Sequence, residues 1–492
     1  MYVATVTVAT KRHVYDPRAW GLARSAILGL GQRLYQFWDR YSDSFQTMTR
    51  DTSVYALDYL SGVLRMNEER NFTSIGRTTG ESPQNIQHFI SHSPWEADEV
   101  LGQIREEISQ TPAFESGGVL ILDESADEKA SNKTVGAGRQ YNGRLGKIEM
   151  SQVGTFLAYA NDGVWTWIDG ELFLPESWFA KGTARERARL GVPAKRKFAT
   201  KIELGWRMIE RVKAEGLPFE LVSCDTLYGR SQWLRRQMAA AGLIYMADVP
   251  CDTRVYLTPP VVGLPQSQAG QSRKRCRRPR VVSQEKPVEG RQVAARSDTT
   301  WRRVRVRASE RGEINDEFSA RRVWTTDGHH QPREEWLVIR RDADGKLYFA
   351  LSNAPADTPL ERLAWGKCQR HFIECSNQEA KSDAGWDELR AQRYLAWEHH
   401  LALTCLATWF IAQTKLDWRQ QYPRQEALKQ ELGIDHLPPL STDNIRELLR
   451  AVMPLPQLTV EGATQLVVER LVNRARSRKS RMKTIGHNHS PP

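Results

Sequence analysis

The stretch GGVLILDES, residues 117–125, decides the fold of this 492-residue chain. Two glycines precede an uninterrupted apolar run, and the run ends at Asp123. A short apolar run bounded by turn residues predicts a strand that is buried on both faces, as in the interior of an α/β sheet. Sites in open α/β sheets gather at the carboxyl ends of strands, so Asp123 is the first candidate functional residue.

The elements that follow this strand predict the topology of the sheet. They are two strands, a helix and a further strand, at residues 152–160, 164–174, 201–216 and 219–224. The first two of these strands are separated by NDG, a hairpin turn signal, and the last ends at Asp225. Three strands that pair as a meander, a helix, a fourth strand and another helix form the order of an RNase H-like sheet. Its first and fourth strands are neighbours, so we expect Asp123 and Asp225 to meet.

The segments on either side of this core differ from it in character. Apolar residues at helical spacing predict a mainly helical N-terminal region. Prolines, glycines and basic runs begin near residue 251, and DADG at 342–345 then joins two alternating segments as a predicted hairpin. We therefore expect a helical region, the first part of an RNase H-like core, a β-rich insertion, the second part of the core and a helical, basic C-terminal region. Their predicted bounds are 1–112, 113–250, 251–360, 361–418 and 419–492.

The charge balance favours a polyanionic partner. Lys and Arg number 70 against 59 Asp and Glu, a net charge of +11. The excess concentrates in runs at 273–280, 301–307 and 474–483. The six cysteines include no CxxC pair, which excludes a disulfide scaffold and a zinc ribbon and favours the reducing cytoplasm. The longest apolar run, 401–412, is too short to span a bilayer, so we expect a buried helix there and no membrane association.

A third candidate carboxylate lies in RHFIECSNQEAK, residues 370–381. Arg370, Glu374 and Lys381 are separated by four and seven residues, steps that return to nearly the same helix face. One interpretation is a metal ligand flanked by two phosphate-binding cations. The other is a solvated, salt-bridged helix face.

Together, Asp123, Asp225 and Glu374 suit metal-dependent phosphodiester chemistry. Carboxylate oxygens are hard ligands that favour Mg²⁺ or Mn²⁺. Two such ions about 4 Å apart activate a water or a 3′-hydroxyl and stabilise the leaving oxygen. Taken singly, a strand-end aspartate more often caps the following turn. Their conjunction, in this topological order and on a basic chain, favours the metal site.

In these features the chain resembles bacterial insertion-sequence transposases of the DDE class. Their signature is Y-x2-R-x3-E-x6-K, and Arg370, Glu374 and Lys381 match it in type and spacing, whereas Lys367 stands in place of the tyrosine. Other matching stretches include ILDESADEK, LFLPESW and CDTLYGR. The resemblance implies an RNase H-like catalytic domain with a β-rich insertion before the glutamate. It also implies that the three carboxylates bind two Mg²⁺ or Mn²⁺ ions.

The same resemblance suggests residues that contact DNA. Arg370 and Lys381 would position phosphates, and Lys367 would keep a phosphate contact with altered geometry. Further candidates near the predicted site, for which a surface charge or a packed ring is the alternative, are Arg139, Lys147, Tyr228 and Arg230.

An insertion-domain tryptophan stacks on a flipped-out base in related transposases, where the stacking offsets the energy of extruding the base. Trp301 and Trp324 are the candidates for this role. Trp336 alternates with Val338 in a predicted strand, so we expect it in the core.

The sequence thus predicts a cut-and-paste transposase that acts in the bacterial cytoplasm at the nucleoid. Its terminal regions would bind the inverted repeats of double-stranded DNA. The resemblance to the family further implies that two protomers act on paired ends in a synaptic complex. Two alternatives differ in class: a transposase-derived protein that binds DNA without cutting it, and an RNase H-like nuclease without strand transfer.

Overall fold

The structure of this chain is a computed structural model that describes residues 13–67, 69–143, 145–264, 278–309, 312–456 and 459–487. Residues 1–12 of the predicted N-terminal region and 273–277 of the first basic run lie outside the described residues. The chain forms two compact units, Met1–Val452 and Met453–Pro492. The second unit contains the helix α18 (Val460–His487).

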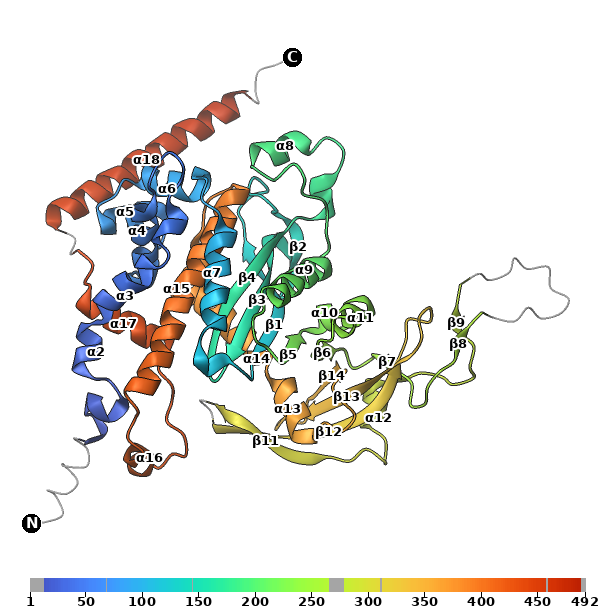
Figure 1. Cartoon of the computed structure of the whole chain (residues 1–492). Coiled ribbons are helices and arrows are strands. Elements are labelled where there is room, and N and C mark those ends of the chain that lie inside the picture. The colour runs from blue at the N-terminus through green and yellow to red at the C-terminus, as the bar shows by residue number, and fades with distance from the viewer. Residues whose placement is uncertain are drawn as a thin grey trace, which may run out of the picture. The chain divides into compact units, whose positions relative to one another are not determined.

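Ten strands of the first unit form one sheet among the described residues (Figure 1). At its centre the order is β4-β3-β1-β5-β6, with β2 beside β3 as well. This is the predicted RNase H-like order, with the first and fourth predicted strands as neighbours. The core strands are β1 (Val119–Glu128), β2 (Gly138–Asn142), β3 (Lys147–Asn161), β4 (Val164–Phe173), β5 (Leu221–Cys224) and β6 (Tyr245–Val249).

Local sequence explains the central strands. All four apolar residues at the start of β1 are buried, as are all four residues of β5, because helices cover both faces of the sheet there. At the NDG turn between β3 and β4, Asp162 and Gly163 have φ of 47° and 73°. Positive φ at both central residues is the type I′ geometry that closes a two-residue hairpin.

The insertion extends this same sheet. Its long strands are β11 (Arg302–Ser309), β12 (Gly312–Thr325), β13 (Arg333–Arg341) and β14 (Leu347–Ser352). The predicted DADG hairpin joins β13 to β14, and β14 pairs antiparallel with β6. The insertion is therefore a continuation of the core sheet, because its last strand covers the edge that β6 would otherwise expose. Short ladders join β7 (Arg254–Val255) to β10 (Val288–Glu289) and β8 (Val262–Gly263) to β9 (Arg280–Val281).

Helix α15 (Tyr394–Gln421) is the central helix of the first unit, and it contains the predicted buried segment 401–412. It packs on β4, on α7 and on the N-terminal helices α4 and α6 (Figure 1). The helices before the sheet are α2 (Arg24–Leu28), α3 (Leu30–Asp39), α4 (Ser53–Arg65), α5 (Phe72–Thr79), α6 (Pro83–His92) and α7 (Ala97–Ser109).

The remaining helices flank the strands or lead to the C-terminal unit. A capping box between Thr200 and Glu203 begins α9 (Lys201–Ala214), the predicted helix between the third and fourth strands. The others are α8 (Ala184–Arg189), α10 (Thr226–Gly229), α11 (Gln232–Ala240), α12 (Gly290–Ala294), α13 (Leu360–Cys368), α14 (His371–Gln378), the π-helical turn η5 (Glu379–Asp383), α16 (Ala427–Leu432) and α17 (Thr442–Val452). In the part of the chain that is described, no helix is both long and apolar enough to cross a membrane.

Candidate active site

Asp123 and Asp225 lie on neighbouring parallel strands. Asp225 directly follows the last residue of β5, whereas β1 continues beyond Asp123 to Glu128, so the predicted end of this strand at Asp123 was wrong. The β1–β5 pairing places Leu122 opposite Cys224, so the two aspartates that follow are level with each other. The side chain of Asp123 is 15% exposed. Its Oδ1 accepts a hydrogen bond from the backbone N–H of Glu124 at 2.7 Å. The fold thus brings both aspartates to one edge of the sheet.

Asp225 also caps the helix that follows it. Its Oδ1 accepts hydrogen bonds from the backbone N–H groups of Leu227 at 2.9 Å and Tyr228 at 3.3 Å. This is the capping role that sequence reasoning weighed against metal binding. Because both bonds use Oδ1, the cap engages only one of the two carboxylate oxygens.

Burial makes negative charge at this edge unfavourable. It raises the pKa of Asp123 to about 7, with the charge of Asp225 as the second cause. Burial likewise raises the pKa of Asp225 to about 6. Two desolvated carboxylates that repel each other are stabilised by a cation, which favours their ionised forms.

Ion pairs of Arg370 connect Glu374 to Asp123. Glu374 lies in α14 and its side chain is 53% exposed, while Arg370 is the residue that caps that helix. Arg370 Nη2 is 2.5 Å from Glu374 Oε1, and its Nη1 is 3.7 Å from Asp123 Oδ2. The guanidinium therefore lies between two of the predicted carboxylates.

Carboxylate oxygens are the donors that hard divalent ions prefer, so the residue types fit Mg²⁺ or Mn²⁺. The described residues nevertheless include no group of three or more His, Cys, Asp or Glu side chains arranged to hold a metal ion. In this arrangement Arg370 supplies the positive charge that the carboxylates require. A bound cation and the guanidinium would thus compete for Asp123 and Glu374.

Lys381 does not share the face of Arg370 and Glu374 as predicted. The α-helix ends at Gln378 and continues as the π-helical turn η5, which contains more residues per turn. The seven-residue step therefore no longer returns to the same face. Lys381 Nζ instead donates to the carbonyl of Ala126 in β1 at 3.1 Å and lies 3.6 Å from Asp127 Oδ1.

Two predicted DNA contacts are buried in the protein interior. Lys367 Nζ is 2.8 Å from Asp248 Oδ1, and the lysine side chain is 5% exposed. Tyr228 is fully buried, and its hydroxyl donates to Thr155 Oγ1 at 3.4 Å. In this conformation neither side chain is accessible to DNA: Tyr228 is the packed ring of the alternative interpretation, and Lys367 is an internal ion-pair partner.

The other three surface candidates are exposed. Arg139 and Lys147 lie on the hairpin of β2 and β3, and Arg230 lies between α10 and α11. Lys147 Nζ forms an exposed ion pair with Glu149 Oε2 at 3.1 Å. Because they are exposed, Arg139, Lys147 and Arg230 can contact phosphates. Their contacts with DNA stay predictions.

Comparison with known proteins assigns the family. A family model described as DDE superfamily endonuclease matches residues 40–313, more than half of the chain. The chain belongs to this DDE superfamily. A probable transposase for insertion sequence element IS701 from Microchaete diplosiphon is 25% identical over 365 residues, which cover 73% of this chain and 83% of that protein. These findings confirm the expected family, DDE-class insertion-sequence transposases. The family-model match includes both aspartates and ends before Glu374.

The candidate stacking tryptophans of this DDE protein are all partly covered. Trp301 packs against the core cluster of the insertion, and the guanidinium carbon of Arg341 lies 3.8 Å from its ring centroid. Trp324 is half-buried. The expectation of a core Trp336 was wrong: its ring is half-buried beneath Arg322, and its Nε1 donates to the carbonyl of Pro355 at 3.0 Å.

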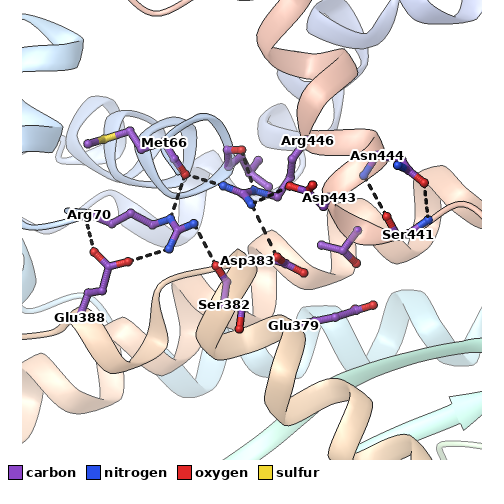
Figure 2. A network of polar contacts seen from close by, with 12 residues as sticks. Met66, Arg70, Glu379, Ser382, Asp383, Glu388, Ser441, Asp443, Asn444 and Arg446 are labelled. Atoms are coloured by element: carbon purple, nitrogen blue, oxygen red, sulfur yellow. Dashed lines mark hydrogen bonds and ion pairs between the residues drawn. The ribbon is translucent and has the colours of Figure 1, made fainter. Parts of the chain in front are cut away.

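Two buried arginines hold the turn that follows Glu374 (Figure 2). Arg70 donates to the Ser382 carbonyl at 3.1 Å and to the Met66 carbonyl at 3.0 Å, and pairs with Glu388 at 2.7 Å. Arg446 of α17 also donates to the Met66 carbonyl and lies 3.7 Å from Asp383. The end of α4, the η5 turn and α17 thus share one polar network.

Sequence reasoning missed Asp248 and these two arginines. Asp248 follows the apolar residues YMA of β6, the same strand-end signal that identified Asp123 and Asp225. No local signal distinguishes Arg70 or Arg446, because most of their partners lie far away in the chain.

The network of Arg446 predicts a loss of stability on its removal. Arg446→Met leaves the Leu64 and Met66 carbonyls without this donor and Asp383 without its cation. Leaving a buried acceptor unsatisfied lowers the free energy of unfolding by about 1–3 kcal/mol. Denaturant unfolding measures this change. Arg450→Met, one turn further along α17, is the matched control, and an equal loss in both variants would refute the role of the network.

The raised pKa values of Asp123 and Asp225 predict a pH-dependent stability. Below pH 7 the folded chain retains protons on these groups that the unfolded chain releases near pH 4. The free energy of unfolding of the metal-free protein therefore falls as pH rises from about 4 to about 7, by at most about 1.4 kcal/mol per pH unit for each group.

Denaturant unfolding in EDTA at several pH values, for wild type and Asp123→Asn, isolates this contribution. The variant should show a flatter fall over the same range, because the amide that replaces the carboxyl group does not titrate. Parallel pH profiles for the two proteins would contradict the assignment.

Proposed function

We propose that this chain is a cut-and-paste DNA transposase. In this proposal it binds the terminal inverted repeats of its element, cuts the transposon ends and joins the resulting 3′-hydroxyls to target DNA. The name of the IS701 relative supports the class of activity. The observation that carries the proposal is the level placement of Asp123 and Asp225 on adjacent parallel strands, with Glu374 linked to Asp123 through Arg370.

Asp123, Asp225 and Glu374 would hold two Mg²⁺ or Mn²⁺ ions. Such ions activate the attacking water or hydroxyl and stabilise the leaving oxygen of a phosphodiester. Arg370 lies beside Asp123 and Glu374, where it would neutralise the DNA backbone next to the scissile phosphate. Lys381, which contacts the carbonyl of Ala126 further along β1, would contact a neighbouring phosphate. Burial of the aspartates excludes water, so these charge interactions are stronger than at the open surface.

The basic surface would supply the sequence-independent part of DNA binding. Arg139, Lys147 and Arg230 are exposed on the catalytic unit, and the second half of α18 presents exposed arginines and a lysine. Two protomers would act on paired ends, so that both ends of one element are cut together. The N-terminal helices and the C-terminal helix would bind the repeats.

Two other functions stay open to experiment. A chain that holds transposon ends without cutting them would be a DNA-binding protein derived from a transposase. A chain that cuts but forms no joined product would be an RNase H-like nuclease. Both differ from a transposase in products that gel analysis separates.

A cleavage assay tests the proposal directly. Wild type with Mg²⁺ or Mn²⁺ should cut DNA that carries the element's ends, whereas Glu374→Gln should bind that DNA and cut at least about 10²-fold more slowly, because one metal ligand is removed. Glu379→Gln is the matched control, since Glu379 is five residues away and pairs with Lys415 at 3.3 Å. Equal cutting by wild type and Glu374→Gln would refute the catalytic role of Glu374.

The proposed role of α18 predicts a smaller dependence of DNA affinity on salt when its cations are removed. Arg474, Arg476 and Arg478 are exposed on this helix. Substitution of all three by Gln should reduce the slope of log K against log salt by about 0.9 for each phosphate that the helix no longer neutralises. Fluorescence anisotropy of a labelled duplex measures this slope. An unchanged slope would exclude this helix from DNA binding.

A further inference from the structure

A third aspartate, Asp248, lies in the same row as Asp123 and Asp225. The parallel pairing of β5 with β6 places Cys224 opposite Ala247, so the next residue, Asp248, is level with Asp225. The pairing of β1 with β5 places Asp225 level with Asp123 in the same way. Three neighbouring parallel strands therefore bring a carboxylate to one edge, and the side chain of Asp248 is 14% exposed. Carboxylates so close together and so little hydrated require cationic partners.

Asp248 receives one cation on each of its oxygens. Lys367 Nζ is 2.8 Å from Oδ1, and Arg370 Nε is 3.3 Å from Oδ2. Lys367 lies near the end of α13 and Arg370 caps α14, so the junction of the two helices is tied to β6. The ammonium of Lys367 is held inside the protein, away from any surface that DNA could reach.

The guanidinium of Arg370 contacts both Asp248 and the candidate metal ligands. Its Nε faces Asp248, while Nη1 is 3.7 Å from Asp123 and Nη2 is 2.5 Å from Glu374. A planar guanidinium that is fixed along its Nε side also has its two terminal nitrogens fixed. Without Asp248, the carboxylates of Asp123 and Glu374 would be its remaining ion-pair partners among the described residues.

We propose that Asp248, paired with Lys367, is a positioning residue that holds part of the guanidinium charge of Arg370 on the β6 side of the site and so weakens the competition of Arg370 with a divalent cation for Asp123 and Glu374. This inference rests on the proposed function, since it concerns the same metal site. Asp248 is not itself a metal ligand in this arrangement. The ammonium of Lys367 lies 2.8 Å from its carboxylate and would repel a second cation there.

Binding of Mn²⁺ to the full-length, metal-free protein without DNA tests the proposal independently of activity. Electron paramagnetic resonance measures the free ion for wild type, Asp248→Asn, Arg370→Gln and the double variant. Asp248→Asn should weaken Mn²⁺ binding about threefold to tenfold, because Arg370 then competes more strongly for Asp123 and Glu374. In the Arg370→Gln background the same substitution should change the binding less than about twofold, because it acts through Arg370.

Glu220→Gln is the matched control. Glu220 directly precedes β5 and pairs with Arg362 of the same helix α13, so this variant removes an exposed ion pair that joins α13 to the other end of the sheet strands. This variant should bind Mn²⁺ as wild type does. Asp248→Asn/Lys367→Met removes both charges of the buried pair and keeps the test valid if Asp248→Asn alone does not fold, and it should weaken Mn²⁺ binding in the same direction.

The outcomes separate this inference from the proposed function. Loss of all Mn²⁺ binding in Asp248→Asn, as expected for Asp123→Asn, would make Asp248 a ligand and overturn the inference. An equal effect of Asp248→Asn with and without Arg370, or no effect at all, would also overturn it while leaving the metal site in place. A wild-type protein that binds no Mn²⁺ would instead refute the metal chemistry of the proposed function, and the inference with it.

A cleavage assay adds a readout that loss of folding would not produce. Asp248→Asn should cut slowly at limiting Mn²⁺ and recover toward the wild-type kcat as Mn²⁺ is raised, with the KM for DNA nearly unchanged. A rate that stays low at saturating Mn²⁺ would contradict competition by Arg370.

Discussion

The parallel pairing between β1 and β5 is the constraint on which the candidate site depends. It places two aspartates at one level of a buried sheet edge, where each raises the electrostatic cost of ionising the other. Several neighbouring groups compensate for this cost. Backbone N–H groups bind one oxygen of each, and Arg370 approaches from the next helix. These contacts offset the repulsion between the two ionised aspartates only in part. The same negative charge attracts divalent cations to the carboxylates.

The position of Glu374 depends on contacts far away in the chain. Its helix is joined to β6 before it, through Lys367 and Asp248, and its following turn is held by Arg70 and Arg446. The half-exposed carboxylate of Glu374 thus lies on a helix whose two ends are held in place by buried charged side chains. Contacts from the N-terminal helices and from α17, shown in Figure 2, therefore affect the position of Glu374 in the candidate site.

Much of the core could be predicted from the sequence because its signals are local. The apolar run before Asp123, the NDG turn and the strand before Asp225 each specify an element, and their order specifies the sheet. The departure of Lys381 from the face of Arg370 and Glu374 could not be predicted, since a π-helical turn breaks the helical period. Lys367 was misjudged because its partner Asp248 is 119 residues away and only the folded sheet brings them together.

The pairing of β14 with β6 affects how the chain folds during its synthesis. The residues between Val249 and Leu347 must fold back before the sheet is continuous, so Glu374 arrives at the aspartates only after a long loop has closed. Such non-local closure is slow relative to helix and hairpin formation. During synthesis the β6 edge would be open until β14 emerges, and an open edge is prone to pair with other chains. A nascent chain therefore carries Asp123 and Asp225 without Glu374, which delays assembly of the candidate site until the insertion is in place.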